Sequence, residues 1–356
     1  MADILTGVIP IVHPDHNLIF QALVVRKGAE RTFSYALETR TLADLPPDEV
    51  LIRVHASTIN YKDCLSCQGH PAITRRFPHT PGVDAAGVVE ASADPACQPG
   101  DRVAVISHAM GMNTPGGFGQ YVRVPAAWVM PLPDALSFHE AMAYGTAGYT
   151  AVLAVEALEA AGSSLAGAQA LVTGATGGLG AFAVALLSAR GAEVTAVTGK
   201  TDEAARAFLS AIGAARILPR DAFEDTTGRN MLVPAWDVAV DVAGGTTLST
   251  VLRSMRDGGV VAVTGMVQGT AFEANVLPFI LRGVHVVGIN AEATTPERRR
   301  AVWARMADTA KPAALPALYS VVGLADLPAA IETVAAGRHL GRIVVDLGGA
   351  DASAPV

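Results

Sequence analysis

The feature that most constrains the fold is a regular alternation of short apolar runs and helical patterns in the middle of the chain. Alternation of this kind is typical of βαβ units, so we predict an α/β fold with a doubly wound, mostly parallel sheet. The predicted strands are 170–173, 193–198, 216–218, 237–242, 260–266 and 285–289, and the predicted helices are 179–190, 202–212 and 247–255.

The regions on either side lack this alternation. Residues 20–124 contain short strand-like runs such as 50–59, interrupted by Pro and Gly and almost without helical periodicity. This pattern favours an irregular, barrel-like β domain. We expect the tail after residue 291, with predicted helices at 296–306 and 325–337 and a last strand at 342–346, to return to that domain. The predicted domains are therefore 1–150 with 291–356, where 1–19 is an extension, and 151–290.

Composition excludes several classes of function. With 356 residues, 51% of them apolar, the chain can bury a large core, and its net charge of −7 argues against nucleic acid as the main partner. No run approaches the roughly 20 apolar residues of a membrane helix. Residues 1–16 lack the basic start and apolar centre of a secretory signal. We therefore expect a cytoplasmic protein that binds neither nucleic acid nor membrane.

The three cysteines do not suggest a disulfide framework. Cys64 and Cys67 form a C-x-x-C pair with His70 three residues further on, so a metal or redox site is one interpretation. A closed zinc site needs four ligands, and no second pair lies at a suitable spacing. Packing near a pocket is the alternative that we favour, and we predict no metal site.

A glycine-rich segment, 173–180, follows the first strand of the alternating region and opens its first helix. Small residues at this place allow the backbone to approach a pyrophosphate, and the helix N-terminus stabilises its charge. The pattern is A-x-G-x-x-G, with Ala175 where the first Gly often stands. We predict a dinucleotide site, with an ordinary glycine-rich turn as the alternative.

The end of the second strand indicates which dinucleotide binds. NAD sites usually have an acidic residue there for the ribose hydroxyls, whereas this chain has Thr198, Gly199 and Lys200 and no carboxylate before Asp202. A hydroxyl and a cation suit a 2′-phosphate, so we predict NADPH as the cofactor. Arg220, after the third strand, is either a second cation on the adenine side or a solvated surface residue.

Several motifs together resemble those of the medium-chain dehydrogenase/reductase superfamily, in particular its zinc-free acrylyl-CoA reductase and quinone oxidoreductase subgroup. They occur in the family's order at 60–63, 81–87, 99–103, 145–150, 174–180 and 278–284. The resemblance runs from about residue 20 to 346. It implies a GroES-like, β-rich catalytic domain formed by both ends of the chain, with an inserted Rossmann domain.

The resemblance also argues against zinc chemistry. Asn60, Val83 and Ala143 stand where zinc-dependent relatives have their catalytic ligands, and the structural-zinc loop is missing. No Lewis acid is then available to polarise a carbonyl group.

Site residues carried over from the family lie mainly around the cofactor. The resemblance implies that the pyrophosphate meets the glycine-rich turn, that cations surround the adenosine phosphate, and that two residues lie near the nicotinamide. Arg342 resembles a C-terminal Arg that reaches back to the phosphates. The implied cofactor residues are Tyr149, Thr176, Gly177, Gly178, Leu179, Thr198, Lys200, Arg220, Met266 and Arg342.

The loop at 60–63 takes the place of the metal and is the predicted catalytic group. Asn60 or Lys62 would stabilise an enolate oxygen, Tyr61 would donate a hydrogen bond or a proton, and Asp63 would orient Lys62. Local hydrogen bonds that only hold the loop together are the alternative. We leave the role of Asp84 open.

By resemblance, the leading function is NADPH-dependent reduction of a small 2-enoyl-CoA thioester, acryloyl-CoA to propanoyl-CoA. Quinone or enone reduction uses the same hydride geometry and is the second candidate; a non-catalytic NADPH-binding protein is the third. Arg75, Arg76 and Arg282 are candidates for CoA phosphates or are solvated. The segment 278–289 resembles the edge through which relatives dimerise, so we expect a homodimer.

Overall fold

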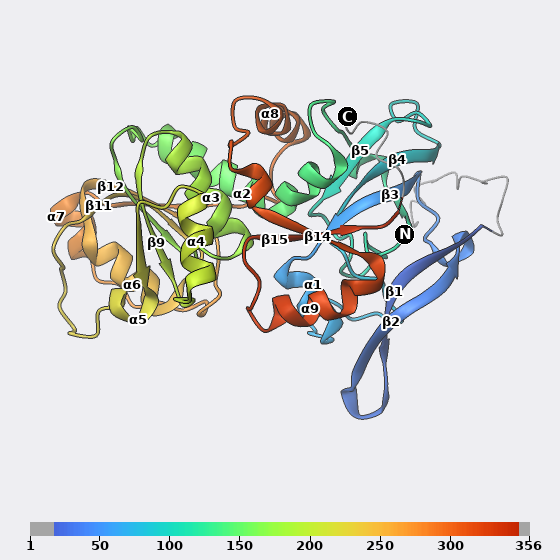
Figure 1. The fold of residues 1–356 in the computed structure, drawn as a ribbon, viewed down its shortest axis with the longest axis horizontal. Helices are drawn as coiled ribbons and strands as arrows, with labels where there is room; N and C mark the ends of the chain where they lie inside the picture. Colours follow the sequence, from blue (N-terminus) through green and yellow to red (C-terminus); the bar gives the residue numbers. More distant parts are fainter. Residues whose placement is uncertain (1–17, 349–356) are drawn as a thin grey trace, which may run out of the picture. The chain divides into compact units, whose positions relative to one another are not determined.

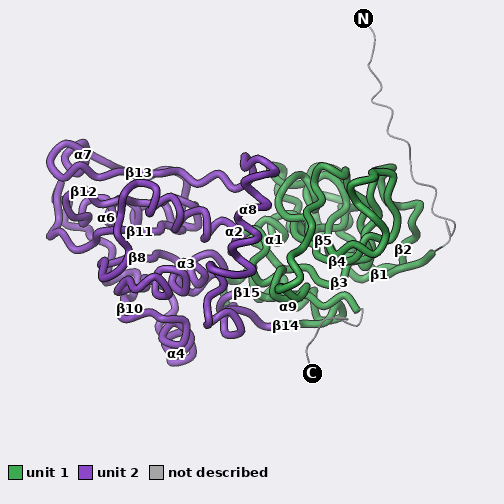
Figure 2. Tube along the Cα trace, turned by 90° about the horizontal axis from the view of Figure 1, so that it is seen from above, with its two compact units in different colours: residues 1–146, 321–338, 343–356 green, residues 147–320, 339–342 purple. Residues whose placement is uncertain are grey.

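The computed structural model describes residues 18–348 and divides them into two compact units (Figure 2). Within the described residues, unit 1 comprises residues 18–146, Val321–Arg338 and residues 343–348. Unit 2 is Ala147–Ser320 together with the short segment His339–Arg342. The chain therefore leaves unit 2 near residue 320, returns to it at residues 339–342, and is in unit 1 again at residues 343–348.

Unit 2 alternates strands and helices, as the sequence predicts. Its elements are β8 (Gln169–Thr173), α3 (Gly178–Ala189), β9 (Glu193–Thr198), α4 (Glu203–Ala211), β10 (Arg216–Pro219), α5 (Arg220–Phe223), β11 (Trp236–Asp241), α6 (Gly245–Ser254), β12 (Met255–Val263), α7 (Leu277–Arg282), β13 (His285–Gly288) and α8 (Pro296–Ala307). The strands pair in parallel in the order β10-β9-β8-β11-β12-β13. The order reverses between β8 and β11, which is the doubly wound Rossmann arrangement. The predicted α/β fold with a parallel sheet is confirmed.

The helices of unit 2 differ in how much of their surface is buried. In the view of Figure 1, α3 and α4 lie on one side of the sheet and α6 on the other. Helix α3 is apolar and buried along most of its length, whereas α4 has buried residues on one face only, at Ala205 and Leu209. Asp202 caps α4 by accepting the N–H of Ala205 at 2.9 Å. The glycine-rich turn is thus held between a buried strand and a buried helix.

Unit 1 is mainly antiparallel β-structure. Its elements are β1 (Ile19–Lys27), β2 (Phe33–Thr41), β3 (Val50–Thr58), α1 (Tyr61–Cys67), β4 (Asp84–Ser92), β5 (Arg102–Ile106), β6 (Tyr121–Val124), β7 (Met130–Pro131) and α9 (Leu327–Ala335), while α2 (Phe138–Ala160), β14 (Tyr319–Gly323) and β15 (Arg342–Asp346) cross the boundary between the units. One sheet has the order β14-β15-β3-β4-β5-β7, with β6 also paired to β3, and β1 pairs with β2. The β-rich first domain is confirmed, and the late strand β15 pairs with β3 as the returning tail requires.

Two details differ from the sequence-based expectation. Residues 60–63, predicted as a loop, are the N-cap and first turn of α1. Residues 291–320 group with unit 2 instead of unit 1. The physical reason is that α8 is tied to α2, because Arg298 and Arg305 donate to Glu156 at 2.5 and 2.7 Å, and Trp303 is buried. Of the predicted extension 1–19, residues 1–17 lie outside the described residues, and Ile19 begins β1.

Candidate active site

The turn between β8 and α3 has the geometry that close approach of a pyrophosphate requires. Gly174 adopts φ 58°, a conformation that favours glycine. At Gly180, an added Cβ would lie 2.4 Å from the carbonyl oxygen of Gly174, so a larger residue would push the turn away from the helix. Gly177 is the N-cap and Gly178 the first residue of α3. The first N–H groups of α3 therefore follow the turn directly, at the positive end of the helix dipole.

Arg342 lies against this helix start. Its side chain is 3% exposed, and a Cβ on Gly178 would come within 2.5 Å of Arg342 Cδ and 3.2 Å of its Nη1. Gly341 donates its N–H to the Thr176 carbonyl at 3.0 Å, which fixes the returning segment to the glycine-rich turn. A cation is thus held at the N-terminus of α3, where the family resemblance predicts a contact with cofactor phosphates.

The end of β9 is connected to the same turn and to the returning segment. The hydroxyls of Thr176 and Thr198 are 3.0 Å apart, and the Lys200 N–H donates to Thr198 Oγ1 at 3.0 Å. The Lys200 ammonium donates to the carbonyl oxygen of His339. Burial lowers the pKa of Lys200, and burial followed by the charges of Lys200 and Arg342 lowers the pKa of His339 to about 4.

The remaining predicted cofactor residues lie in different surroundings. The Arg220 guanidinium approaches Gly199, where a Cβ would be 3.5 Å from Nη1, and it pairs with Asp221 at 3.2 Å. Met266 follows β12 and is 63% exposed. Tyr149 is fully buried; its hydroxyl donates to Thr294 Oγ1 at 2.9 Å, and the Arg299 guanidinium lies 5.6 Å from its ring. The contacts of Tyr149 and Met266 with a nicotinamide stay predictions.

These residues fit a dinucleotide that carries an additional phosphate. The glycine turn leads directly into the first N–H groups of α3, Arg342 supplies a cation beside them, and Lys200 and Arg220 place positive charge next to Gly199. Within unit 2, the structure brings together the predicted residues of the glycine turn with Thr198, Lys200, Arg220 and Arg342.

The predicted catalytic residues form the start of α1. Asn60 is the N-cap, with its side chain bonded to the Asp63 N–H and the Asp63 carboxylate bonded to the Asn60 N–H, a capping box. Tyr61 is 59% exposed, and Lys62 is partly exposed. Asn60 and Asp63 thus hold the turn, whereas Tyr61 presents its side chain to solvent.

Asp63 has surroundings that the sequence did not predict. It is fully buried, and its carboxylate accepts the N–H groups of Asn60 at 2.7 Å, Gly82 at 3.1 Å and Val83 at 3.0 Å. Burial raises its pKa to about 7. The carboxylate oxygens of Asp63 therefore accept hydrogen bonds from the backbone and support the local chain. None of these three bonds involves Lys62, which Asp63 was predicted to orient.

The family resemblance assigns Asn60, Val83 and Ala143 to the positions of zinc ligands. The side chains of Val83 and Ala143 are buried and carry no lone pairs, and Asn60 is bonded within the capping box. Cys64 and Cys67 face the core, where the Cys64 thiol lies 3.7 Å from the Ile331 carbonyl, and burial raises the pKa of Cys64 to about 12. Across residues 18–348, no group of three His, Cys, Asp or Glu side chains is placed to hold a metal ion.

The three arginines predicted as candidates for contact with CoA phosphates differ in how they are bonded within the protein. Arg282 donates to the carbonyls of Arg253, Met255 and Leu232, so it supports the end of α6 and is not available to a ligand. Arg75 donates to the Pro71 carbonyl at 2.9 Å, and both Arg75 and Arg76 are exposed.

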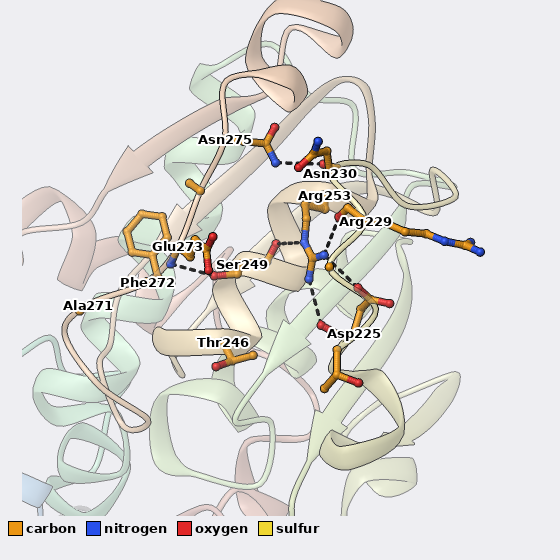
Figure 3. A pocket seen from close by; sticks show the side chains of 13 residues that line it. Asp225, Arg229, Asn230, Thr246, Ser249, Arg253, Ala271, Phe272, Glu273 and Asn275 are labelled. Carbon is orange, nitrogen blue, oxygen red and sulfur yellow. Dashed lines mark hydrogen bonds and ion pairs between the residues drawn. The ribbon is translucent and has the colours of Figure 1, made fainter.

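A separate pocket of about 650 Å³ lies in unit 2 beside α6 (Figure 3). Its walls come from 225–230 and 271–275, and Arg253 in its wall donates to Asp225 at 2.9 Å. In the described part of the chain, none of the predicted catalytic or cofactor residues lines this pocket.

Among residues 18–348, no helix is long and apolar enough to cross a membrane.

Two family models match this chain, one in its first part and one in its middle part. The family model of the alcohol dehydrogenase GroES-like domain matches residues 46–134, and that of the zinc-binding dehydrogenases matches residues 178–309. Acrylyl-CoA reductase AcuI of Ruegeria pomeroyi is 40% identical over 92% of this chain and 99% of its own length.

Two solved structures have the same fold over nearly the whole chain. The yhdH oxidoreductase of Salmonella enterica, solved in complex with NADP, superposes with a TM-score of 0.87 at 37% identity, covering 92% of this chain and all of that one. Bacillus subtilis yhfP, solved with NAD, gives 0.88 at 41% identity, with coverage of 93% and 100%.

A GroES-like unit and a Rossmann unit with a dinucleotide turn define an oxidoreductase of the medium-chain type. The chain belongs to the medium-chain dehydrogenase/reductase superfamily, and it is similar in sequence to acrylyl-CoA reductases and quinone oxidoreductases of that superfamily.

Sequence reasoning missed two contributors to the site. His339, whose carbonyl holds Lys200, lies three residues before Arg342, and that proximity was the available signal. Asp84, whose role was left open, accepts from the Asn60 side chain at 2.8 Å. It lies within the family motif at 81–87, so the motif marked its position but gave no partner.

Proposed function

We propose that the protein is an NADPH-dependent, zinc-independent reductase of the C=C bond of small 2-enoyl-CoA thioesters, with acryloyl-CoA as substrate and propanoyl-CoA as product. The observation that carries this proposal is the 40% identity to an acrylyl-CoA reductase over almost the full length of both chains.

The preference for NADPH over NADH rests on the residues after β9. Lys200 and Arg220 gather positive charge beside Gly199, and Thr198 stands where NAD sites usually have a carboxylate. Similar chains were solved with NADP and with NAD, so the relatives alone do not decide between the two cofactors. The proposed preference for NADPH rests on this chain's own residues.

When bound, NADPH supplies the hydride for the β carbon of the activated alkene. Negative charge then develops on the thioester carbonyl oxygen, and this charge requires a hydrogen-bond donor. Tyr61 and Lys62 carry donors at the start of α1, and the capping box of Asn60 and Asp63 holds them in place. Either side chain stabilises the enolate oxygen, and the Tyr61 hydroxyl is the candidate proton source for the α carbon.

The test is NADPH consumption with acryloyl-CoA, crotonoyl-CoA and a simple quinone in parallel. We expect acryloyl-CoA to give the largest kcat/KM. Faster turnover of the quinone would favour the quinone oxidoreductase alternative, and tight NADPH binding without turnover of any substrate would favour a non-catalytic protein.

We further propose that the protein is a homodimer. Strand β13 is at the edge of the unit 2 sheet, and beside it α7 exposes Ile280 by 69% and Leu281 by 64%. An open strand edge with exposed apolar residues is a typical surface for pairing with another chain. Light scattering after gel filtration should give twice the monomer mass, and Ile280→Glu should reduce it to the monomer mass.

A further inference from the structure

We propose that Asp84 is a positioning residue for the catalytic turn. Its buried carboxylate connects Asn60, at the start of α1, to Thr146 in α2, and thereby sets the orientation of Tyr61 and Lys62. This inference rests on the proposed catalytic role of that turn, and it assigns a task to a carboxylate that does not itself touch the substrate.

The bonds to Asp84 come from two parts of unit 1 that are far apart in sequence. Asn60 Nδ2 donates to Asp84 Oδ2 at 2.8 Å. Thr146 donates its backbone N–H to the same oxygen at 2.9 Å and its hydroxyl to Oδ1 at 2.6 Å. Asp84 is fully buried, so these bonds form where they are not exchanged for water.

The backbone of α2 is shaped to make this contact. Gly145 has φ 46° and ψ −152° within the helix, a conformation that favours glycine. The helical path is therefore interrupted immediately before Thr146, and the Thr146 N–H donates to Asp84. An uninterrupted helix would direct this N–H to a carbonyl one turn earlier.

A second strained turn supports the same hydroxyl. Ser107 and His108, directly after β5, have φ 62° and 59° although neither is glycine. The Ser107 hydroxyl lies 3.1 Å from Thr146 Oγ1. Since the Thr146 hydroxyl donates to Asp84, we assign Ser107 as the donor to Thr146. Unfavourable backbone conformations persist where the surrounding structure fixes them, and they concentrate at functional sites.

The Asp84 carboxylate has a structural as well as a positioning effect. Removing it would leave the donors of Asn60 and Thr146 without their acceptor, which lowers stability. What a carboxylate adds is directional acceptance of several donors at once. At Asp84 these donors are the N-cap of the catalytic turn and the interrupted helix.

The test compares Thr146→Val, which loses the hydroxyl and keeps the N–H, with Thr146→Ser, which retains the hydroxyl. Thr250→Val is the control, since Thr250 is also a helical threonine whose hydroxyl is hydrogen-bonded; Thr250 is buried, whereas Thr146 is half-buried. We expect Thr146→Val to lower the single-turnover rate about 10–100-fold, with NADPH affinity within about threefold. Thr146→Ser and Thr250→Val should stay within about threefold of the wild-type rate.

Hydrogen exchange gives a readout that is independent of turnover. Peptides that cover residues 60–67 should exchange faster in Thr146→Val and in Asp84→Asn than in the wild type or in Thr250→Val. Rates are measured with whichever of acryloyl-CoA or a quinone the wild type reduces. A failure of the proposed substrate is therefore seen in the wild type, separately from the variants. Unchanged rates and unchanged exchange in Thr146→Val would overturn the positioning role.

Discussion

The proposed catalytic turn of unit 1, residues 60–63, and the proposed phosphate site of unit 2 are organised by different side chains, acidic in the first and basic in the second. At the turn, buried carboxylates accept hydrogen bonds: Asp63 from backbone N–H groups, and Asp84 from Asn60 and Thr146. At the phosphate site, side-chain cations are held in place by the protein, with Lys200 bonded to the His339 carbonyl and Arg342 packed on Gly178.

This difference separates two tasks. The carboxylates of Asp63 and Asp84 accept hydrogen bonds from the protein itself. These bonds fix the backbone that carries the donor groups of Tyr61 and Lys62. The cations of unit 2 would add charge-assisted hydrogen bonds to an anionic phosphate of the cofactor. Changes at the turn should therefore act on the chemical step, and changes at the phosphate site should act on cofactor binding.

The largest expected effect is at the turn. Removing one oxyanion donor typically lowers kcat by about 10²–10³-fold, so we expect a loss of this size in single-turnover reduction of acryloyl-CoA by Lys62→Met or Tyr61→Phe. NADPH affinity should stay within about threefold. Lys27→Met, an exposed lysine in β1, is the control. A rise in substrate KM alone would mean a binding role, and full rates in both variants would make the turn structural.

The next effect is at the phosphate site. A charge-assisted hydrogen bond contributes roughly 1.5–3 kcal/mol, so Lys200→Ala should raise the KM for NADPH by about 10–100-fold and barely change that for NADH. Arg206→Ala removes an exposed cation on the neighbouring helix α4 and should leave both constants unchanged. An equal loss with both cofactors in Lys200→Ala would remove the assignment of Lys200 to the phosphate.

The two regions also differ in how much of them the sequence could predict. Around the cofactor, periodicity placed the strands and α3, and the glycine spacing located the turn, because these signals are local in sequence. The contact of Arg342 with Gly178 spans more than 160 residues and was expected only from the family resemblance.

At the turn, local signals were insufficient. The capping box joins Asn60 to a residue three positions later, yet the short helix that it opens was not recognised, since α1 extends only over Tyr61–Cys67. The partners of Asp63 at Gly82 and Val83, and of Asp84 at Thr146, come from chain segments that only tertiary packing brings together. Spacing in one sequence does not identify such bonds.

A smaller effect concerns the pH dependence of stability at the phosphate site. The pKa of His339 is lowered from its usual 6.5 to about 4. A histidine whose pKa is lowered by folding stabilises the protein above pH 6.5, and this contribution is lost as the pH falls from 6.5 towards 4, because the unfolded chain binds the proton first. We expect the wild type to lose about 1 kcal/mol more than His339→Gln between pH 7.5 and 5.5, measured by urea denaturation. Parallel pH profiles of the two proteins would contradict this assignment.

The smallest expected effect is that of a chelator, and it tests whether the turn replaces a metal. The side chains of Val83 and Ala143 offer no ligand atoms at two of the positions that the family resemblance assigns to zinc ligands. The neighbouring thiols of Cys64 and Cys67 are buried in the core of unit 1, and among the residues that the structure describes, 18–348, no group of three His, Cys, Asp or Glu side chains is placed to hold a metal ion. Prolonged dialysis against EDTA should therefore leave turnover unchanged. In the same assay, Lys62→Met should be slow with or without added zinc, because the donor that it removes belongs to the protein. Activity that disappears with EDTA and returns with zinc would show that a metal, and not the turn, stabilises the developing charge.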